Sequence, residues 1–289
     1  MSIDTAIAAF LFLCVLLTTL AAWLVGPQML AALRRARVRR QPFPPAWRDV
    51  LRRRMPAFAH LPADVQWQVK KHAQVLIAEK PFIGCAGLVV THEMRVLVAV
   101  QAALLLLHRR AGNFANLRQV LIYPGAFVVD RVTADGAGLA HDTRRVLSGE
   151  SWQQGQVILS WDDVLSGAAD PHDGQNVVIH EFAHQLDQET GAANGAPGGL
   201  GQARRARWAR VLGHEYALLQ QRLARGETGL IGAYAATDPA EFFAVLSELF
   251  FERPAELAAA HASLYAELAL YYRADPLLWL SSVPAAKPA

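Results

Sequence analysis

Hydrophobic residues in this chain form one long uninterrupted run near the start and shorter, periodic patterns after it. Residues 6–25 are apolar except for Thr18 and Thr19. A helix of this length, at about 1.5 Å per residue, can cross a bilayer. Gly26 and Pro27 follow the run, and we expect them to end the helix. The pattern therefore predicts one transmembrane helix within residues 1–28.

Beyond residue 45, apolar positions recur mainly with helical spacing, and short strand patterns interrupt them in mid-chain. Residues 94–107 form an apolar run that is too short to cross a membrane, so we expect a buried helix there. Further helices are predicted at residues 47–80 (with breaks at Pro56 and Pro62), 176–186, 203–223, 239–251 and 255–272. Strands are predicted at residues 120–123, 127–132 and 156–161.

These elements predict an α+β fold, mostly helical with a small mixed sheet. A glycine-rich stretch at residues 192–201 predicts a loop, and residues 277–289 predict a frayed tail. The expected organisation has four parts: an anchor at residues 1–28, a basic juxtamembrane linker at 29–45, one folded domain at 46–280, and a flexible tail at 281–289.

Charge is distributed unevenly along the chain. The 289 residues carry a formal net charge of +3, but residues 33–54 hold nine arginines and one aspartate, so that stretch carries +8 and the remainder −5. No nucleic-acid-binding motif accompanies the basic stretch, and we expect no direct binding of nucleic acid. Two cysteines exclude a disulfide framework and an all-cysteine metal cluster.

The arginines also predict an orientation for the anchor. They follow the apolar run, and positive residues flank membrane helices on the cytoplasmic side. No Lys or Arg precedes the run, unlike in a cleaved signal peptide. We therefore expect a single-pass protein of the inner (cytoplasmic) membrane with its main domain in the cytoplasm; a cytoplasmic protein is the alternative.

One motif indicates chemistry. His180-Glu181-Phe182-Ala183-His184 is an H-E-x-x-H pattern, and on a helix its two imidazoles share a face and can bind one zinc ion. Glu181 is offset from that face, so it can contact a water molecule instead of the metal. Two other His-Glu pairs, at His92 and His214, lack a second histidine and are typical of helix surfaces or caps.

A catalytic zinc ion needs a third protein ligand and one open position. The residue six positions after His184, a histidine in one class of zinc peptidases, is Thr190 here, so the ligand lies elsewhere. Glu241 begins an apolar helix, but Asp238-Pro239-Ala240-Glu241 is equally a capping-box pattern. Glu248 is its main rival, or else a partner for a ligating imidazole. The other candidates are Glu215, Glu227, Asp238, Glu252, His214 and His261.

Around these residues the chain resembles the Mlc titration factor A family of zinc metallopeptidases. The motifs that carry the resemblance are residues 180–187, the glycine-rich loop and residues 234–248, with further matches at residues 91–95, 101–107, 121–127 and 149–161. The resemblance covers about residues 42–280. It implies a zincin-like domain whose catalytic core is related to the peptidase domain of anthrax lethal factor.

The resemblance also implies roles for individual residues. It makes His180, His184 and Glu241 the ligands of one zinc ion, Glu181 the general base and Tyr234 the tyrosine that stabilises the transition state. The implied activity is hydrolysis of peptide bonds by zinc-activated water, aminopeptidase-like on short peptides. Without the resemblance, Tyr234 would be interpreted as a buried aromatic residue beside a turn.

Other functions stay open on the sequence. Members of the family bind Mlc, a repressor of glucose-uptake genes, so the resemblance also implies a regulatory protein that sequesters an Mlc-like repressor. A zinc amidase acting on non-peptide substrates is a third hypothesis. The strand at residues 156–161 is either an edge strand that pairs with extended substrate or an interior strand. The best-known family members are cytosolic, so residues 1–28 are a departure from them.

Overall fold

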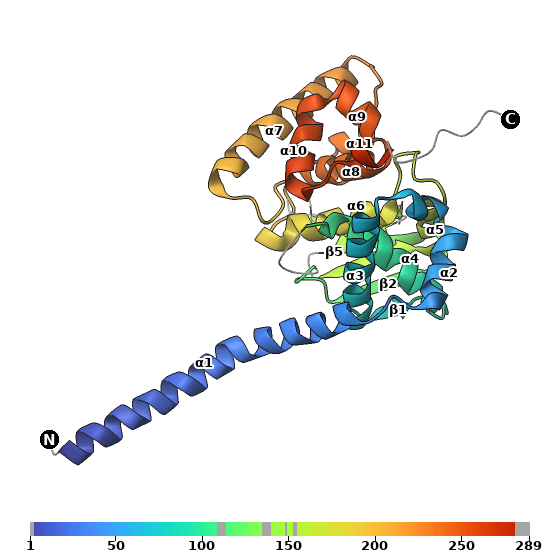
Figure 1. The fold of residues 1–289 in the computed structure, drawn as a ribbon. Coiled ribbons are helices and arrows are strands. Elements are labelled where there is room, and N and C mark those ends of the chain that lie inside the picture. Colours follow the sequence, from blue (N-terminus) through green and yellow to red (C-terminus); the bar gives the residue numbers. More distant parts are fainter. Residues whose placement is uncertain (1–2, 109–113, 135–139, 148, 153–154, 281–289) are drawn as a thin grey trace. The chain divides into compact units, whose positions relative to one another are not determined.

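The computed structural model describes residues 3–108, 114–134, 140–147, 149–152 and 155–280 (Figure 1). Contacts along the chain divide it into two compact units, Met1–Pro42 and Phe43–Ala289.

The first unit is a single helix, α1 (Ile3–Arg40). The prediction that Gly26 and Pro27 end it is wrong, because α1 continues through Pro27. Proline lacks an N–H, and its ring clashes with the carbonyl four residues earlier, so it kinks a helix that is otherwise stable. The two arms of α1, Phe10–Trp23 and Val25–Arg40, are accordingly bent by 40°. The arginines expected in a linker at residues 29–45 are therefore helical as far as Arg40.

In the described residues no single helix has both the length and the apolar composition needed to cross a membrane. The two arms of α1 meet those criteria only when they are taken together across the bend. Large apolar side chains of α1, such as Phe12 and Trp23, are exposed, at 70% and 74%.

The second unit begins with three helical segments, α2 (Pro45–Arg54), η1 (Pro56–His60) and α3 (Ala63–Glu79). Each starts at or beside a proline, which fits the first turn of a helix because its missing N–H has no partner there. The breaks predicted at Pro56 and Pro62 are confirmed.

The apolar run in mid-chain is a buried helix, as its length predicts. It forms α4 (His92–Ala103), continued by the short η2 (Leu104–Leu106), and the side chains from Val96 to Ala103 are fully buried. Thr91 caps α4 by accepting a hydrogen bond from the Met94 N–H at 3.3 Å.

The sheet is mixed, as predicted. Its strand order is β1 (Phe82–Gly84), β2 (Gln119–Tyr123), β6 (Gln156–Ser160) and β5 (Gly149–Trp152). The first three strands are parallel and β5 is antiparallel to β6. Because β6 pairs on both sides, it is the interior strand of the two interpretations left open for residues 156–161, and β5 takes the edge position among the described strands.

Two more strands, β3 (Phe127–Ala134) and β4 (Ala140–Leu147), form a separate antiparallel pair. The strand predicted at residues 127–132 is confirmed as most of β3, whereas β4 was not predicted from the sequence. Polar and charged residues such as Asp130 and Arg144 sit in the pair and obscure the strand pattern of β4.

The C-terminal half is helical. Two predictions fail there: residues 255–272 form two helices that break at His261, and residues 276–280 are helical where a frayed tail was expected. The tail predicted at residues 281–289 lies outside the described residues. The helical elements are α5 (Trp161–Ala169), α6 (Val177–Asp187), η3 (Gln188–Thr190), α7 (Gln202–Ala224), η4 (Ala233–Ala236), α8 (Pro239–Glu252), α9 (Pro254–Ala260), α10 (Ala262–Tyr272) and α11 (Pro276–Leu280).

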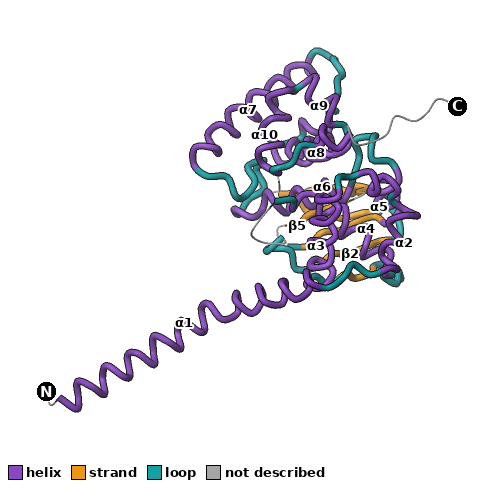
Figure 2. The backbone as a smooth tube through the Cα atoms, in the orientation of Figure 1, coloured by secondary structure: helices purple, strands orange, loops and turns teal. Residues whose placement is uncertain are grey.

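Helix α6 lies at the centre of the second unit (Figure 2). It packs against β5 and β6 of the sheet, against α4 and α5, and against α8 of the C-terminal helices. An aromatic cluster holds those helices together, with Trp208 of α7 lying 5.7 Å from Phe243 of α8 between ring centroids. Helix α6 therefore lies between the sheet with its helices and the C-terminal group of helices.

The glycine-rich loop at residues 192–201 lies between η3 and α7 and has no regular structure, as predicted. The Gly195 N–H donates to Asp187 Oδ2 at 2.7 Å, and its carbonyl accepts from Trp208 Nε1 at 2.8 Å. Gly195 has a positive φ of +75°, and a Cβ there would lie 2.4 Å from the Pro239 carbonyl oxygen. This close approach fixes the start of α8 against the end of α6.

We expect Gly195→Ala to lower the free energy of unfolding by about 1–3 kcal/mol, because the left-handed backbone becomes strained and the Pro239 carbonyl must move. Thermal unfolding measures the effect. Gly201→Ala is the matched control, since a Cβ at Gly201 would have nothing within 4 Å of it. Equal melting temperatures for the two variants would show that the loop does not fix α8.

Candidate active site and metal centre

The H-E-x-x-H motif lies on α6, whose start is capped by Asn176. The Asn176 side chain accepts a hydrogen bond from the Ile179 N–H at 3.0 Å. In the loop that precedes α6, Asp173 accepts a hydrogen bond from the Gln175 N–H. The apolar face of α6, including Phe182, is fully buried. The helix is therefore fixed along its length, and its polar face is presented to α8.

His180 and His184 lie one turn apart on α6, with ring centroids 4.9 Å from each other. Glu241 reaches both from α8: its Oε2 lies 2.9 Å from His180 Nε2 and 3.5 Å from His184 Nε2. Asp238, not Glu241, caps α8, by accepting from the N–H groups of Ala240 and Glu241. The capping pattern is real, and it leaves the Glu241 carboxylate free to face the imidazoles.

One ligand atom from each of His180, His184 and Glu241 lies within 4.8 Å of the others, a grouping that can hold a metal ion. Two imidazole nitrogens and one carboxylate oxygen match the ligand set of catalytic metal sites that keep an open position. Burial alone raises the pKa of Glu241, but hydrogen bonds with His180 and His184 outweigh it and hold that pKa well below its usual range. The carboxylate is thus kept in the charged form that a metal needs.

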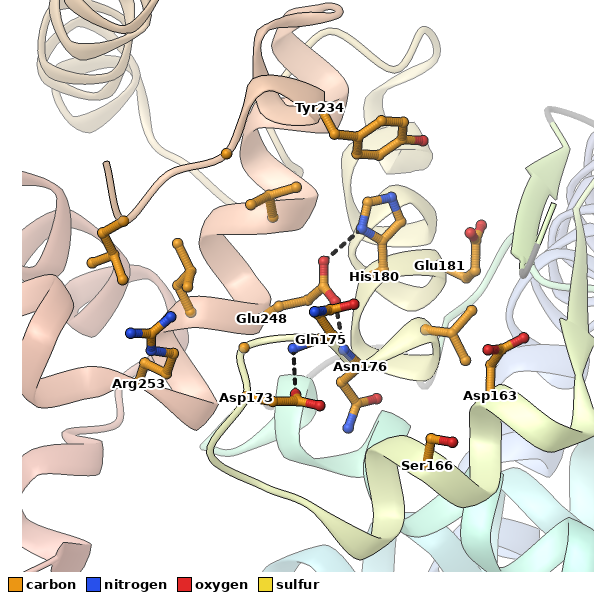
Figure 3. A pocket seen from close by; sticks show the side chains of 16 residues that line it. Asp163, Ser166, Asp173, Gln175, Asn176, His180, Glu181, Tyr234, Glu248 and Arg253 are labelled. Atoms are coloured by element: carbon orange, nitrogen blue, oxygen red, sulfur yellow. Dashed lines mark hydrogen bonds and ion pairs between the residues drawn. The ribbon is translucent and has the colours of Figure 1, made fainter. Parts of the chain in front are cut away.

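Glu248 contacts the opposite side of the His180 ring. Its Oε1 lies 2.8 Å from His180 Nδ1, and its Oε2 accepts the Asn176 N–H at 2.5 Å (Figure 3). Burial lowers the pKa of His180, yet the hydrogen bonds with Glu241 and Glu248 raise it well above its usual value. Glu248 therefore orients a candidate ligand and is not part of the three-residue grouping itself, which decides between the two roles considered for it.

A further acid, Glu252, continues the same face of α8. Asn176 Nδ2 donates to Glu252 Oε1 and to Gln101 Oε1, both at 2.9 Å. Burial raises the pKa of Glu252 to about 8. Its role in this network was not predicted, although the spacing of Glu241, Glu248 and Glu252 places all three on one helical face, a signal that is visible in the sequence.

The site opens into a cavity of about 660 Å³ whose lining includes His180, Glu181 and Tyr234. His184 and Glu241 are not lining residues, so the cavity meets the grouping from the His180 side. Glu181 is only 5% exposed. Tyr234, on η4, is 53% exposed and lies 5.9 Å from His180 between ring centroids, so the interpretation of it as a buried aromatic is wrong (Figure 3). Tyr216 of α7 supports η4 by donating to the Ala236 carbonyl at 2.9 Å.

The remaining candidate ligands contact other groups. His214 is exposed on α7, and Asp238 caps α8. The His92-Glu93 pair lies at a helix surface, as predicted. Within that pair, Glu93 forms ion pairs with Arg53 and Arg54. The other candidate ligands form hydrogen bonds or ion pairs away from the grouping: Glu215 with His261, Glu227 with Arg225, and Glu252 with Asn176.

Comparison with known proteins identifies the family of this chain. Residues 30–273 match the model of a family described as glucose-regulated metallo-peptidase M90. The chain belongs to this family. It is 38% identical over 240 residues to an uncharacterised protein of Synechocystis sp., a match that covers 82% of this chain and 87% of that protein. It is 36% identical over 236 residues to proteins named Mlc titration factor A of Yersinia pestis and Yersinia pseudotuberculosis, covering 80% of this chain and 85% of each.

Membership of the family identifies a metallopeptidase-type domain and implies a metal ion. The His-His-Glu grouping between α6 and α8 is suited to bind one. The resemblance to the Mlc titration factor A family, stated from the motifs, is thereby confirmed.

We expect Glu248→Gln to weaken metal binding at the grouping, measured with Zn²⁺ as the probe ion, by about 10–100-fold, the usual cost of removing a group that orients a ligand. Both Glu248 oxygens accept hydrogen bonds, and glutamine offers only one acceptor. Competition against a fluorescent chelator measures the affinity. Glu227→Gln, which removes an exposed carboxylate on the surface, is the control. Unchanged affinity in Glu248→Gln would contradict the orienting role.

Proposed function

We propose that this chain is a zinc-dependent metallopeptidase that hydrolyses peptide bonds, with an aminopeptidase-like preference for short peptides. The observation that carries the proposal is the grouping of His180, His184 and Glu241 beside Glu181 at one cavity. Neutral imidazoles and a carboxylate are ligands that zinc prefers. Zinc, when bound there, supplies Lewis-acid chemistry that polarises a peptide carbonyl and acidifies a water molecule.

Glu181 is the proposed general base. It follows His180 by one residue on α6, so its side chain leaves the helix about 100° away from that imidazole. The carboxylate side chain lines the cavity (Figure 3). Burial leaves it 5% exposed, which limits competition from bulk water. In the proposed reaction its carboxylate accepts the proton of the attacking water and then passes that proton to the leaving amine.

Tyr234 is the proposed stabiliser of the oxyanion. Its phenol is an O–H donor on a short turn at the cavity wall, and its ring lies beside His180. A donor aimed at the developing negative charge lowers the barrier without changing the metal ligands. Its exposure of 53% leaves the ring accessible to a substrate that enters the cavity.

The cavity also supports the proposed substrate class. Its acidic lining residues Asp163 and Asp173 favour a positively charged peptide end, while the lining cation Arg253 is already paired with Glu256. Strand β5 lies at the edge of the sheet and contacts α6. We therefore expect β5, and not the interior strand β6, to pair with an extended peptide. This arrangement of edge strand and motif helix is the basis for a zincin-like assignment.

A second function follows from the relatives' name. Proteins named Mlc titration factor A suggest that this chain sequesters an Mlc-like transcriptional repressor, with peptidase activity secondary. That function needs a binding surface and does not need Glu181 chemistry, so the two can be separated by experiment.

We further propose that α1 anchors the chain in the cytoplasmic membrane with the domain in the cytoplasm. Its support is the apolar run at residues 6–25, the exposed side chains of α1 and the arginines that follow them. A cytoplasmic location remains the alternative.

We expect Glu181→Gln to retain stoichiometric zinc and to lose about 10²–10⁴-fold in kcat, because only the proton acceptor is removed. Tyr234→Phe should also retain zinc and lose rate, whereas His184→Ala should lose the metal. Metal analysis and a panel of chromogenic peptides, alanyl substrates included, measure both properties. An active Glu181→Gln enzyme would refute the general base.

The same variant separates the two functions. If Glu181→Gln still complements a deletion strain while its peptidase activity is lost, then repressor binding is the main role. Loss of complementation together with activity supports the peptidase.

Alkaline phosphatase fused after Pro44 tests the anchor. We expect an inactive fusion, because the enzyme folds only outside the cytoplasm, and we expect the fusion protein in the membrane fraction. Deletion of residues 1–28 is the control and should release the protein to the soluble fraction. High phosphatase activity would contradict the proposed orientation, because it would place the residues after α1 outside the cytoplasm.

A further inference from the structure

A second cavity, of about 350 Å³, lies in the N-terminal part of the second unit, among α2, η1 and α3. Three of its lining residues are cations, Arg48 and Arg52 from α2 and Lys70 from α3, and none of its lining residues is acidic. Arg48 and Arg52 are four residues apart and therefore share one face of α2. This basic cavity is separate from the metal centre, with which it shares no lining residue.

The cations at this cavity are only partly compensated. Arg52 pairs with Asp49, whereas no described acidic side chain pairs with Arg48 or Lys70. The Lys70 Nζ lies 5.4 Å from the centroid of the Phe58 ring and 3.3 Å from Gln66 Oε1. Burial, and then repulsion by Arg48, lower the pKa of Lys70. An anion placed between these side chains would relieve that repulsion.

The wall of the basic cavity is apolar. Leu51, Met55 and Phe58 line it and are 4%, 7% and 4% exposed. A small inorganic anion gains nothing from such a wall, whereas an amphiphile places its charge on the cations and its hydrocarbon on the wall. The cavity thus fits a ligand that is both anionic and partly apolar.

The position of the basic cavity in the sequence points to the source of that ligand. Arg48 follows the last residue of α1 by eight positions, within the stretch 33–54 that carries nine arginines and one acid. Basic residues close to a membrane helix are attracted to anionic lipid on the cytoplasmic surface. We propose that the basic cavity binds the headgroup phosphate of an anionic phospholipid, a role that rests on the proposed membrane location and not on the peptidase activity.

The test uses the full-length chain in neutral maltoside micelles, so that binding does not depend on which way α1 inserts. Dihexanoylphosphatidylglycerol is titrated by calorimetry, with dihexanoylphosphatidylcholine and inorganic phosphate as comparison ligands. We expect saturable binding of one phosphatidylglycerol per chain, and binding of the two comparison ligands at least about tenfold weaker.

The triple variant Arg48→Gln, Arg52→Gln, Lys70→Gln should weaken binding of phosphatidylglycerol by about 10–100-fold. The matched control, Arg34→Gln, Arg35→Gln, Arg37→Gln, removes the same charge from α1 and should change binding less than about threefold. Thermal unfolding and zinc content check that both variants are folded. Should the triple variant not fold, Arg48→Gln alone changes one exposed side chain and is expected to weaken binding about threefold or more.

Three results would overturn the proposal: equal binding by the wild type and the variants of the cavity, equal loss in the α1 control, or equal binding of phosphatidylcholine or phosphate. The last result would assign the cavity to a neutral amphiphile or to a free anion. Loss of peptidase activity with lipid binding intact would leave the cavity assignment standing, because the two sites share no residue.

Discussion

The packing of α6 against α8 centres on one buried imidazole that is held from both sides. His180 of α6 meets Glu241 at Nε2 and Glu248 at Nδ1, and both carboxylates come from α8. Charged and polar groups this deeply buried are stable only when they are paired. The contact therefore joins two helices that lie about 60 residues apart in sequence and makes their packing polar at its centre and apolar around it.

The surrounding fold restricts both helices independently of that contact. Asn176 caps α6 and also binds Glu248 and Glu252, so the start of one helix is tied to the middle of the other. At the far end, Asp187 holds Gly195, whose backbone approaches the start of α8. Two separate connections thus hold the carboxylates and the imidazoles in register, as a pre-organised site requires.

Much of this was predictable from local patterns. The shared face of the H-E-x-x-H histidines and the burial of α4 follow from helical periodicity, which depends only on neighbouring residues. The choice of Glu241 as the third member of the grouping did not follow from the residues alone, because its capping pattern and its carboxylate chemistry fitted equally well. The break at His261 and the interior position of β6 depend on long-range packing or on pairing partners that no local pattern encodes.

Helix α8 sets a strict limit on how this chain can change over evolution. Glu241, Glu248 and Glu252 share one face only because seven and then four residues separate them. A single inserted residue between the first two would turn the rest of the helix by about 100° and shift it by about 1.5 Å. Glu248 would then leave His180, and Glu252 would leave Asn176. Length changes inside α8 would therefore separate these acids from their partners on α6.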